Sequence, residues 1–131
     1  MSQVARGLAD TTVFIAAESG RSLREASLPE RLAVSVITLG ELRAGVLAAT
    51  DPTIRERRLA TLTAVLALDP IPIDADVAEA WAGLRIRLRD AGQRMAVNDS
   101  WIAATAMALE IPVVTQDDDY VDIPGLSVIH V

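Results

Sequence analysis

Four acidic side chains stand where a parallel sheet could bring them together. Asp10, Glu41 and Asp117 each follow a short apolar run, and Asp99 opens a helical segment. Because the carboxyl ends of parallel strands lie along one edge of a sheet, we expect the four carboxylates to meet there. Carboxylates so close together repel one another unless a cation lies among them, and oxygen ligands suit Mg²⁺ or Mn²⁺. The pattern therefore predicts a site for a hard divalent cation.

Each acid also has a purely structural interpretation. Asp10 and Asp99 could be helix N-caps, a role worth about 1 kcal/mol. Glu41 could be the partner of an N-cap at Thr38 in a capping box. The run 117–119 could be a solvated acidic turn. None of these interpretations explains why the acids fall together at strand ends.

The elements that would position these acids alternate along the chain. Strands are predicted at 4–9, 32–36, 71–73, 113–115 and 126–131, and helices at 11–17, 38–49, 52–66, 76–91 and from 97 to about 109, with a short helical turn near 24–26. Proline in 71–73 suggests an edge strand, and Asp76 and Glu79 are the predicted caps of the helix that follows. Such alternation predicts an α/β fold with a mainly parallel four- to five-stranded sheet covered by helices.

Length and composition limit the alternatives. The 131 residues, 51% of them hydrophobic, suit a single domain spanning 1–131. No apolar run of about 18 residues and no secretion signal is evident, so the expected location is the cytoplasm and not the membrane. Because the chain has no cysteine, thiolate metal sites and disulfides are excluded.

Charge argues against two further classes of site. A net charge of −6 is unlike that of proteins that bind nucleic acid through a broad basic surface. It does not exclude a metal-dependent nuclease, because bound dications would offset the acids. All 12 basic residues are arginine, and phosphate-binding loops and several phosphoryl-transfer sites of α/β proteins require a lysine. Those classes are therefore disfavoured.

The local sequences around the acids are similar to those of a known family. Four segments closely resemble the motifs of PIN-domain ribonucleases, above all the VapC toxins of bacterial toxin–antitoxin pairs: Leu8–Phe14, Gly40–Gly45, Asn98–Thr105 and Val113–Tyr120. They follow the family's order over essentially the whole chain. The resemblance implies a PIN-like three-layer α/β/α sandwich.

The same resemblance assigns residues to the site. It implies four catalytic and metal-binding acids: Asp10, Glu41, Asp99 and Asp117. Three consecutive aspartates occupy the last motif, so Asp119 is an alternative to Asp117. Thr12 and Thr115 match small hydroxyl positions that support an acid or a metal-bound water in the family.

The implied activity is hydrolysis of RNA phosphodiester bonds by an endoribonuclease that uses one or two Mg²⁺ or Mn²⁺ ions. The implied partners are a VapB-type antitoxin and a second copy of the chain in a homodimer. Apolar helices within 38–66 offer additional surface for such contacts. Two rival functions stay open: a non-catalytic PIN-like module that binds RNA or protein, and a small metal-dependent phosphatase.

Arginines near the motifs are the candidates for binding RNA phosphates: Arg43, Arg85, Arg89 and Arg94. Any one of them could equally be an ordinary surface arginine. Trp81 and Trp101 lie beside apolar stripes, where we expect core or interface positions; base stacking is the alternative.

Overall fold

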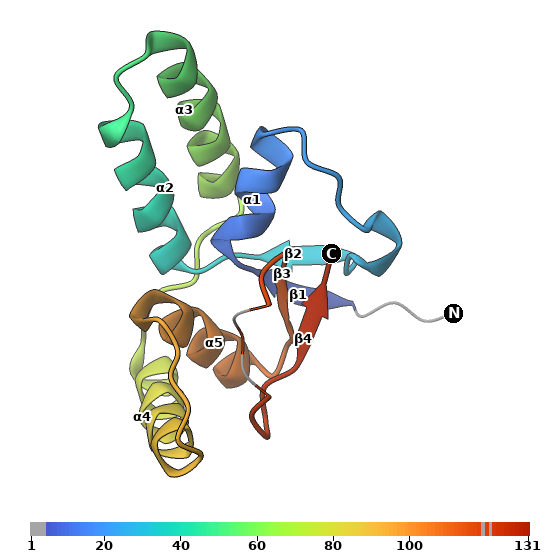
Figure 1. The fold of residues 1–131 in the computed structure, drawn as a ribbon, viewed down its shortest axis with the longest axis vertical. Helices are drawn as coiled ribbons and strands as arrows, with labels where there is room; N and C mark the ends of the chain where they lie inside the picture. The colour runs from blue at the N-terminus through green and yellow to red at the C-terminus, as the bar shows by residue number, and fades with distance from the viewer. Residues whose placement is uncertain (1–4, 119, 121) are drawn as a thin grey trace.

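A four-stranded parallel sheet lies at the centre of the computed structural model, which describes residues 5–118, 120 and 122–131 (Figure 1). In order across the sheet the strands are β2 (Arg31–Ala33), β1 (Arg6–Ala9), β3 (Val113–Thr115) and β4 (Val128–His130). All three pairings are parallel, which confirms the prediction of a mainly parallel sheet. The carboxyl ends of β1 and β3 are therefore neighbours at one edge.

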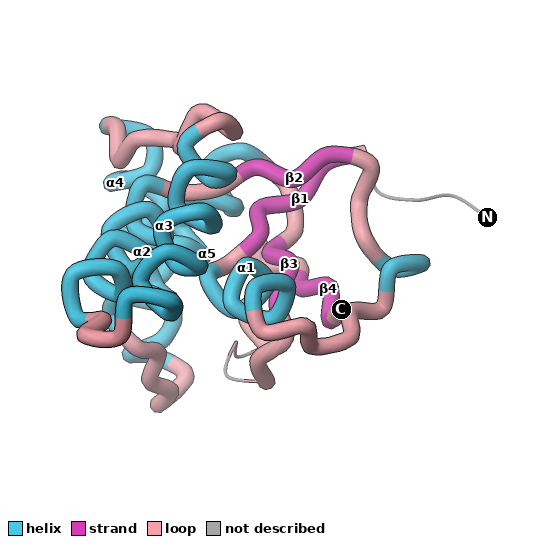
Figure 2. The backbone as a smooth tube through the Cα atoms, turned by 90° about the horizontal axis from the view of Figure 1, so that it is seen from above, coloured by secondary structure: helices cyan, strands magenta, loops and turns pink. Residues whose placement is uncertain are grey.

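Helices cover both faces of this sheet. They are α1 (Thr11–Glu18), α2 (Val36–Ala48), α3 (Pro52–Leu66), α4 (Ala75–Asp90) and α5 (Val97–Leu109), with a short 3₁₀ helix, η1 (Glu25–Ser27). Figures 1 and 2 show α1 on one face and α5 on the other, with α4 packed behind α5 and α2 and α3 side by side as a helical hairpin. The three-layer α/β/α prediction is confirmed. None of the described helices is long and apolar enough to cross a membrane.

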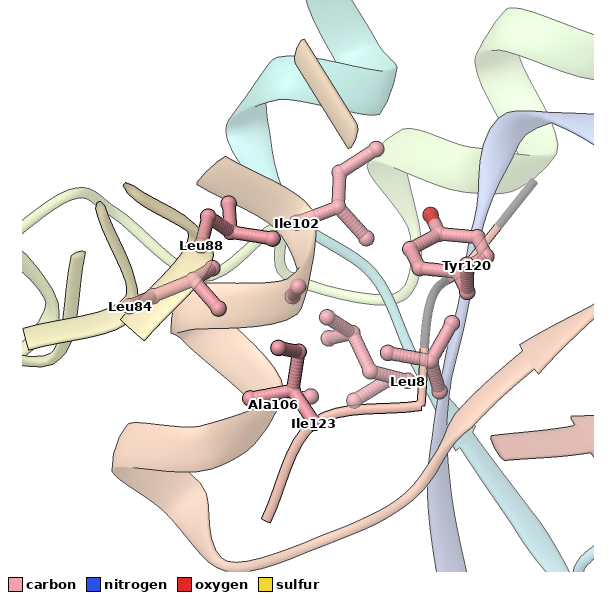
Figure 3. Close-up of a cluster of buried hydrophobic side chains, with 10 residues drawn as sticks. Leu8, Leu84, Leu88, Ile102, Ala106, Tyr120 and Ile123 are labelled. Atoms are coloured by element: carbon pink, nitrogen blue, oxygen red, sulfur yellow. The ribbon is translucent and has the colours of Figure 1, made fainter. Parts of the chain in front are cut away.

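Successive side chains of β1 and β3 point to opposite faces of the sheet, so each face has its own buried cluster. Leu8 and Val113 belong to the buried cluster on the α5 side, which also contains Leu84 and Ile102 (Figure 3). Their chain neighbours Ala9 and Val114 belong to the cluster on the α1 side. A third cluster joins α2 to α3. Because both faces are covered, the central strands are apolar on both sides, as parallel strands require.

Gly7 allows β1 to approach its neighbours closely. A Cβ at this position would lie 2.6 Å from Val114 Cγ2 and 2.7 Å from Pro29 Cγ. Any larger residue would push β1 away from β3. The glycine therefore helps to hold the two strand ends, and the side chains that follow them, at their observed separation.

The start of α2 differs from the prediction. The strand ends at Ala33, and Ser35 is the N-cap, its Oγ accepting from the Ile37 amide at 3.0 Å. The capping box of Thr38 and Glu41 was wrong, since Ser35 satisfies the free amides of the helix before Thr38 is reached. Thr38 is instead buried inside the helix, and Glu41 lies in its second turn.

Three other predicted details were wrong. The predicted strand 71–73 is reduced to one bridge between Ser35 and Ile71, because a proline interrupts its hydrogen bonding. Asp74, not Asp76 or Glu79, caps α4, its Oδ1 accepting from the Val77 amide at 2.9 Å. The last strand spans only Val128–His130.

Candidate active site

Asp10 is the N-cap of α1, directly after β1. Its Oδ1 accepts hydrogen bonds from the Thr12 amide at 3.1 Å and the Thr12 hydroxyl at 2.5 Å. Its Oδ2 accepts one from Thr115 Oγ1 at 2.6 Å. The side chain is only 2% exposed. Both oxygens are thus fixed by neutral donors, one residue in the first turn of α1 and one at the end of β3, and the capping interpretation of Asp10 holds alongside any chemical role.

The two threonines also fix the loop after β3. Thr12 Oγ1 accepts from the Gln116 amide at 3.0 Å, and Thr115 Oγ1 accepts from the Asp117 amide at 2.9 Å. The hydroxyls themselves are 3.3 Å apart. This network attaches the loop that carries Asp117 to the end of β1, where Asp10 lies.

Glu41 reaches the same edge from α2. Its Oε1 accepts from Thr11 Oγ1 at 2.6 Å, and its Oε2 accepts from Asn98 Nδ2 at 3.4 Å. Thr11 Oγ1 also lies 3.0 Å from Thr38 Oγ1. Since Thr11 opens α1 and Asn98 lies in the first turn of α5, Glu41 connects three helices at the carboxyl edge of the sheet.

The charges of three of the acids reach the side chain of Tyr120. Its ring belongs to the core cluster on the α5 side, with its oxygen at the margin of the cluster (Figure 3). Burial, together with the negative charges of Asp10, Asp99 and Asp117, raises the pKa of this tyrosine. Acids from the end of β1, the start of α5 and the loop after β3 are therefore near enough to Tyr120 for their charges to affect it.

The Tyr120 hydroxyl is buried and lies near the Asp10 carboxylate, but it forms no hydrogen bond of good geometry with the residues that the structure describes. Sequence analysis did not single out this tyrosine as a site residue. The available signal was its position, three residues after Asp117 in the loop that leaves β3. A buried polar atom without a partner costs stability, which an added ligand or water at the site would recover.

Known proteins resemble this chain along almost its whole length. The sequence profile of the PIN domain matches residues 8–126. Ribonuclease VapC5 of Mycobacterium tuberculosis is 50% identical over 127 residues, 97% of this chain and 94% of that protein. Ribonuclease VapC4 of the same organism is 48% identical over 128 residues, 98% of each chain.

The chain belongs to the PIN-domain family, in its VapC group. The crystal structure of VapBC-5, a member of the VapBC family of toxin–antitoxin systems from Mycobacterium tuberculosis, matches with a TM-score of 0.89. It is 47% identical in sequence, and the match covers 97% of this chain and 99% of that chain. This PIN domain therefore has its relatives' fold over almost its whole length.

The donor chemistry of the PIN domain suits a hard divalent ion, because carboxylate and hydroxyl oxygens are the ligands that Mg²⁺ and Mn²⁺ favour. The unpartnered Tyr120 hydroxyl marks a buried polar position beside these oxygens. In the described part of the chain, no three His, Cys, Asp or Glu side chains lie close enough together to form a ready-made metal site. Asp119, the alternative fourth acid, lies outside the described residues. An ion held by Asp10, Asp99 and Asp117 thus requires side chains to turn toward it.

The four candidate arginines separate into two places on the PIN domain. Arg85, Arg89 and Arg94 line one pocket beside α4 and the start of α5. Arg43 lies in another pocket, between α2 and α3, with Leu39 among its neighbours. If Arg43 binds RNA, it therefore does so on a different part of the surface from Arg85, Arg89 and Arg94.

Proposed function

We propose that this chain is the toxin component of a VapBC-type pair, an endoribonuclease that hydrolyses RNA phosphodiester bonds with the help of Mg²⁺ or Mn²⁺. The observation that carries the proposal is the hydrogen-bond network at the carboxyl edge of the sheet, where Thr12 and Thr115 hold the oxygens of Asp10, and Thr11 and Asn98 hold those of Glu41. Half of the aligned residues are identical to those of a protein named a ribonuclease, which supports the same activity for this chain.

The acids have distinct roles in this proposal. Asp10, Asp99 and Asp117 hold the ion, with Asp119 as the alternative to Asp117, and Glu41 binds it directly or orients the attacking water. Bound there, a dication lowers the pKa of water and offsets the negative charge that develops on the phosphate. Thr12 and Thr115 keep the Asp10 oxygens in place, and Thr11 does the same for Glu41.

The partners follow from the group and from the surface of α2 and α3. A solved relative is described as a member of a toxin–antitoxin family. On this chain, Leu47, Leu59 and Leu66 are 66%, 44% and 51% exposed. We assign this apolar surface to a VapB-type antitoxin and to a second copy of the chain. Light scattering during size-exclusion chromatography should show a dimer at micromolar concentration; a stable monomer would remove the dimer from the proposal.

Cleavage of RNA by the purified protein tests the proposed activity. Structured and single-stranded RNAs are incubated with Mg²⁺, Mn²⁺ or EDTA. Cleavage should require a metal and should be lost in Asp99→Asn, whereas the matched variant Asp76→Asn, altered at an exposed acid in the first turn of α4, should retain it. RNA bound but never cut would support the non-catalytic module. Phosphate released from small phosphoesters, with RNA intact, would support the phosphatase.

A further inference from the structure

A pocket of about 320 Å³ lies between α4 and the first turn of α5. Its lining includes three arginines and no acidic residue, although the whole chain carries a net charge of −6. The lining residues used below are Trp81, Arg85, Arg89, Arg94, Val97 and Ser100. Such a concentration of one charge, against the sign of the protein as a whole, indicates an anion as the ligand.

Trp81, which lines this pocket, is stacked on a second indole, that of Trp101. The rings of Trp81 and Trp101 lie 4.2 Å apart, centroid to centroid, with an angle of 1° between them. Trp81 Nε1 donates to Ser100 Oγ at 3.0 Å, and Ser100 Oγ donates to the Val97 carbonyl at 2.5 Å. The platform is therefore fixed to the first turn of α5. Trp81 packs against Trp101 and also lines the pocket. The predicted core position therefore accounts for only one of its two contacts.

Arg85 is held over this platform. Its Cζ lies 4.9 Å from the centroid of the Trp81 ring, a distance at which a cation is attracted to the face of an aromatic ring. The guanidinium forms no hydrogen bond or ion pair with the residues that the structure describes. Arg89 differs, because it pairs with Asp90 at 3.3 Å. Arg85 is therefore oriented in advance, with donors available for an oxyanion.

The pocket and the acids share one turn of helix. Val97 and Ser100 line the pocket, while Asn98 donates to Glu41 and Asp99, between Asn98 and Ser100, is one of the proposed ligands of the ion. A strand of RNA whose scissile phosphate lay at the acids could therefore cross the start of α5 and enter the pocket. Val97, 68% exposed, adds an apolar surface beside that path.

We propose that this pocket binds a backbone phosphate of the single-stranded RNA next to the cleaved bond, with Arg85 and Arg94 as the ligands and the indole pair as the support of Arg85. The inference rests on the proposed function for its choice of RNA. It assigns the substrate a second point of attachment, which fixes the direction of the strand across the acids. Arg89 contributes less than Arg85, because Asp90 already offsets its charge.

Tryptophan fluorescence can report on this pocket without any cleavage. Trp81 and Trp101 are the only two tryptophans in the chain, and they stack on each other. The full-length protein is titrated in EDTA with a short single-stranded oligouridylate, and the change in emission gives the dissociation constant. Arg85→Gln and Arg94→Gln should each weaken binding about tenfold, since a hydrogen bond to a charged group is lost. Each should also lower the slope of log K against log salt by about 0.7.

A matched variant separates the pocket from general charge effects. Arg57→Gln removes an exposed arginine of α3, away from the pocket, and should leave the affinity almost unchanged. In cleavage assays Arg85→Gln should raise KM with little effect on kcat. Equal affinities for the Arg85, Arg94 and Arg57 variants would overturn the proposal. An oligoglutamate peptide that changes the emission where oligouridylate does not would also overturn it, and would identify a site for an acidic protein segment.

Failure of this inference and failure of the proposed function give different results. If the wild-type protein binds oligouridylate with the predicted dependence on Arg85 but cleaves no RNA with any metal, the pocket stands and the ribonuclease proposal fails. If RNA is cleaved and Arg85→Gln has the wild-type KM and affinity, the ribonuclease stands and the pocket proposal fails.

Discussion

Thr115 Oγ1 donates a 2.6 Å hydrogen bond to Asp10 Oδ2, joining residues that are 105 positions apart in the sequence. Thr115 is fully buried and Asp10 is almost so. The contact joins the end of β1 to the end of β3 at the carboxyl edge of the sheet. Two neighbouring parallel strands thus place one side chain each in a common network, and the orientation of Asp10 depends on both.

Replacing Thr115 tests this network. Thr115→Val removes the donor to Asp10 Oδ2 and the acceptor for the Asp117 amide, so a buried carboxylate oxygen loses its partner. We expect the free energy of unfolding to fall by about 1–3 kcal/mol, as measured by urea denaturation. RNA cleavage should fall further than this loss of stability explains. Thr63→Val, at an exposed site on α3, is the control and should change unfolding by well under 1 kcal/mol. Equal effects of the two variants would contradict the account.

Thr11→Val tests the position of Glu41. The variant loses the 2.6 Å hydrogen bond to Glu41 Oε1, while Asn98 still donates to Oε2. Because Glu41 is half-buried and water can replace the lost donor, we expect stability to change by about 1 kcal/mol or less. The kcat for RNA should fall severalfold, since Glu41 is no longer held in one orientation. Unchanged kcat, with folding confirmed by circular dichroism, would show that this contact has no part in the chemistry.

Gly7→Ala tests the close approach of β1 to its neighbours. The added methyl group would lie 2.6 Å from Val114 Cγ2 and 2.7 Å from Pro29 Cγ, so either β1 or these side chains must shift. We expect a loss of about 1–3 kcal/mol from the stability and reduced activity, because Asp10 follows this strand. Gly83→Ala is a matched comparison: it lies within α4 with nothing within 4 Å of the new carbon, and should stabilise the protein by about 0.5–1 kcal/mol. The prediction fails if both substitutions shift the thermal unfolding midpoint the same way.

Tyr120 should resist ionisation at alkaline pH. Burial and the charges of three acids raise the pKa of this side chain above that of an ordinary tyrosine, which is about 10. Above pH about 10 the unfolded state loses the phenol proton while the folded state keeps it. The contribution of Tyr120 to the free energy of unfolding is therefore fully present below that pH and declines above it. As the only tyrosine in the chain, Tyr120 can be followed by its ultraviolet absorbance. Tyrosinate should appear only together with unfolding; its appearance in folded protein near pH 10 would refute the assignment.

The sequence was sufficient where local chemistry determines the structure. Asp10 ends a strand and caps a helix, and both features are local to the segment 6–12. The apolar runs of β1 and β3 and the periodicity of α4 predicted buried elements, and the parallel sheet followed from their alternation. The sequence alone therefore predicted that the acids lie at the carboxyl edge of the sheet.

The sequence was insufficient where the outcome depends on contacts between distant segments. Serine and threonine are both favourable N-cap residues, so the sequence alone does not distinguish Ser35 from Thr38. Ser35 is the N-cap because β2 already ends at Ala33. The role of Tyr120 depends on acids from β1, α5 and its own loop. Likewise, the division of the arginines between two pockets follows from the packing of α4 against α5 and of α2 against α3, which no periodicity reveals.

The central claim is that acids distant in the sequence form one site for a hard divalent cation. Crystals grown or soaked with Mn²⁺ and measured at a wavelength where manganese scatters anomalously would locate the ion directly. We predict an anomalous peak at the carboxyl edge of β1 and β3, within about 2.0–2.3 Å of an Asp10 oxygen and bound by at least one of Asp99 and Asp117. No peak at that edge, or manganese held by acids elsewhere on the chain, would contradict the account.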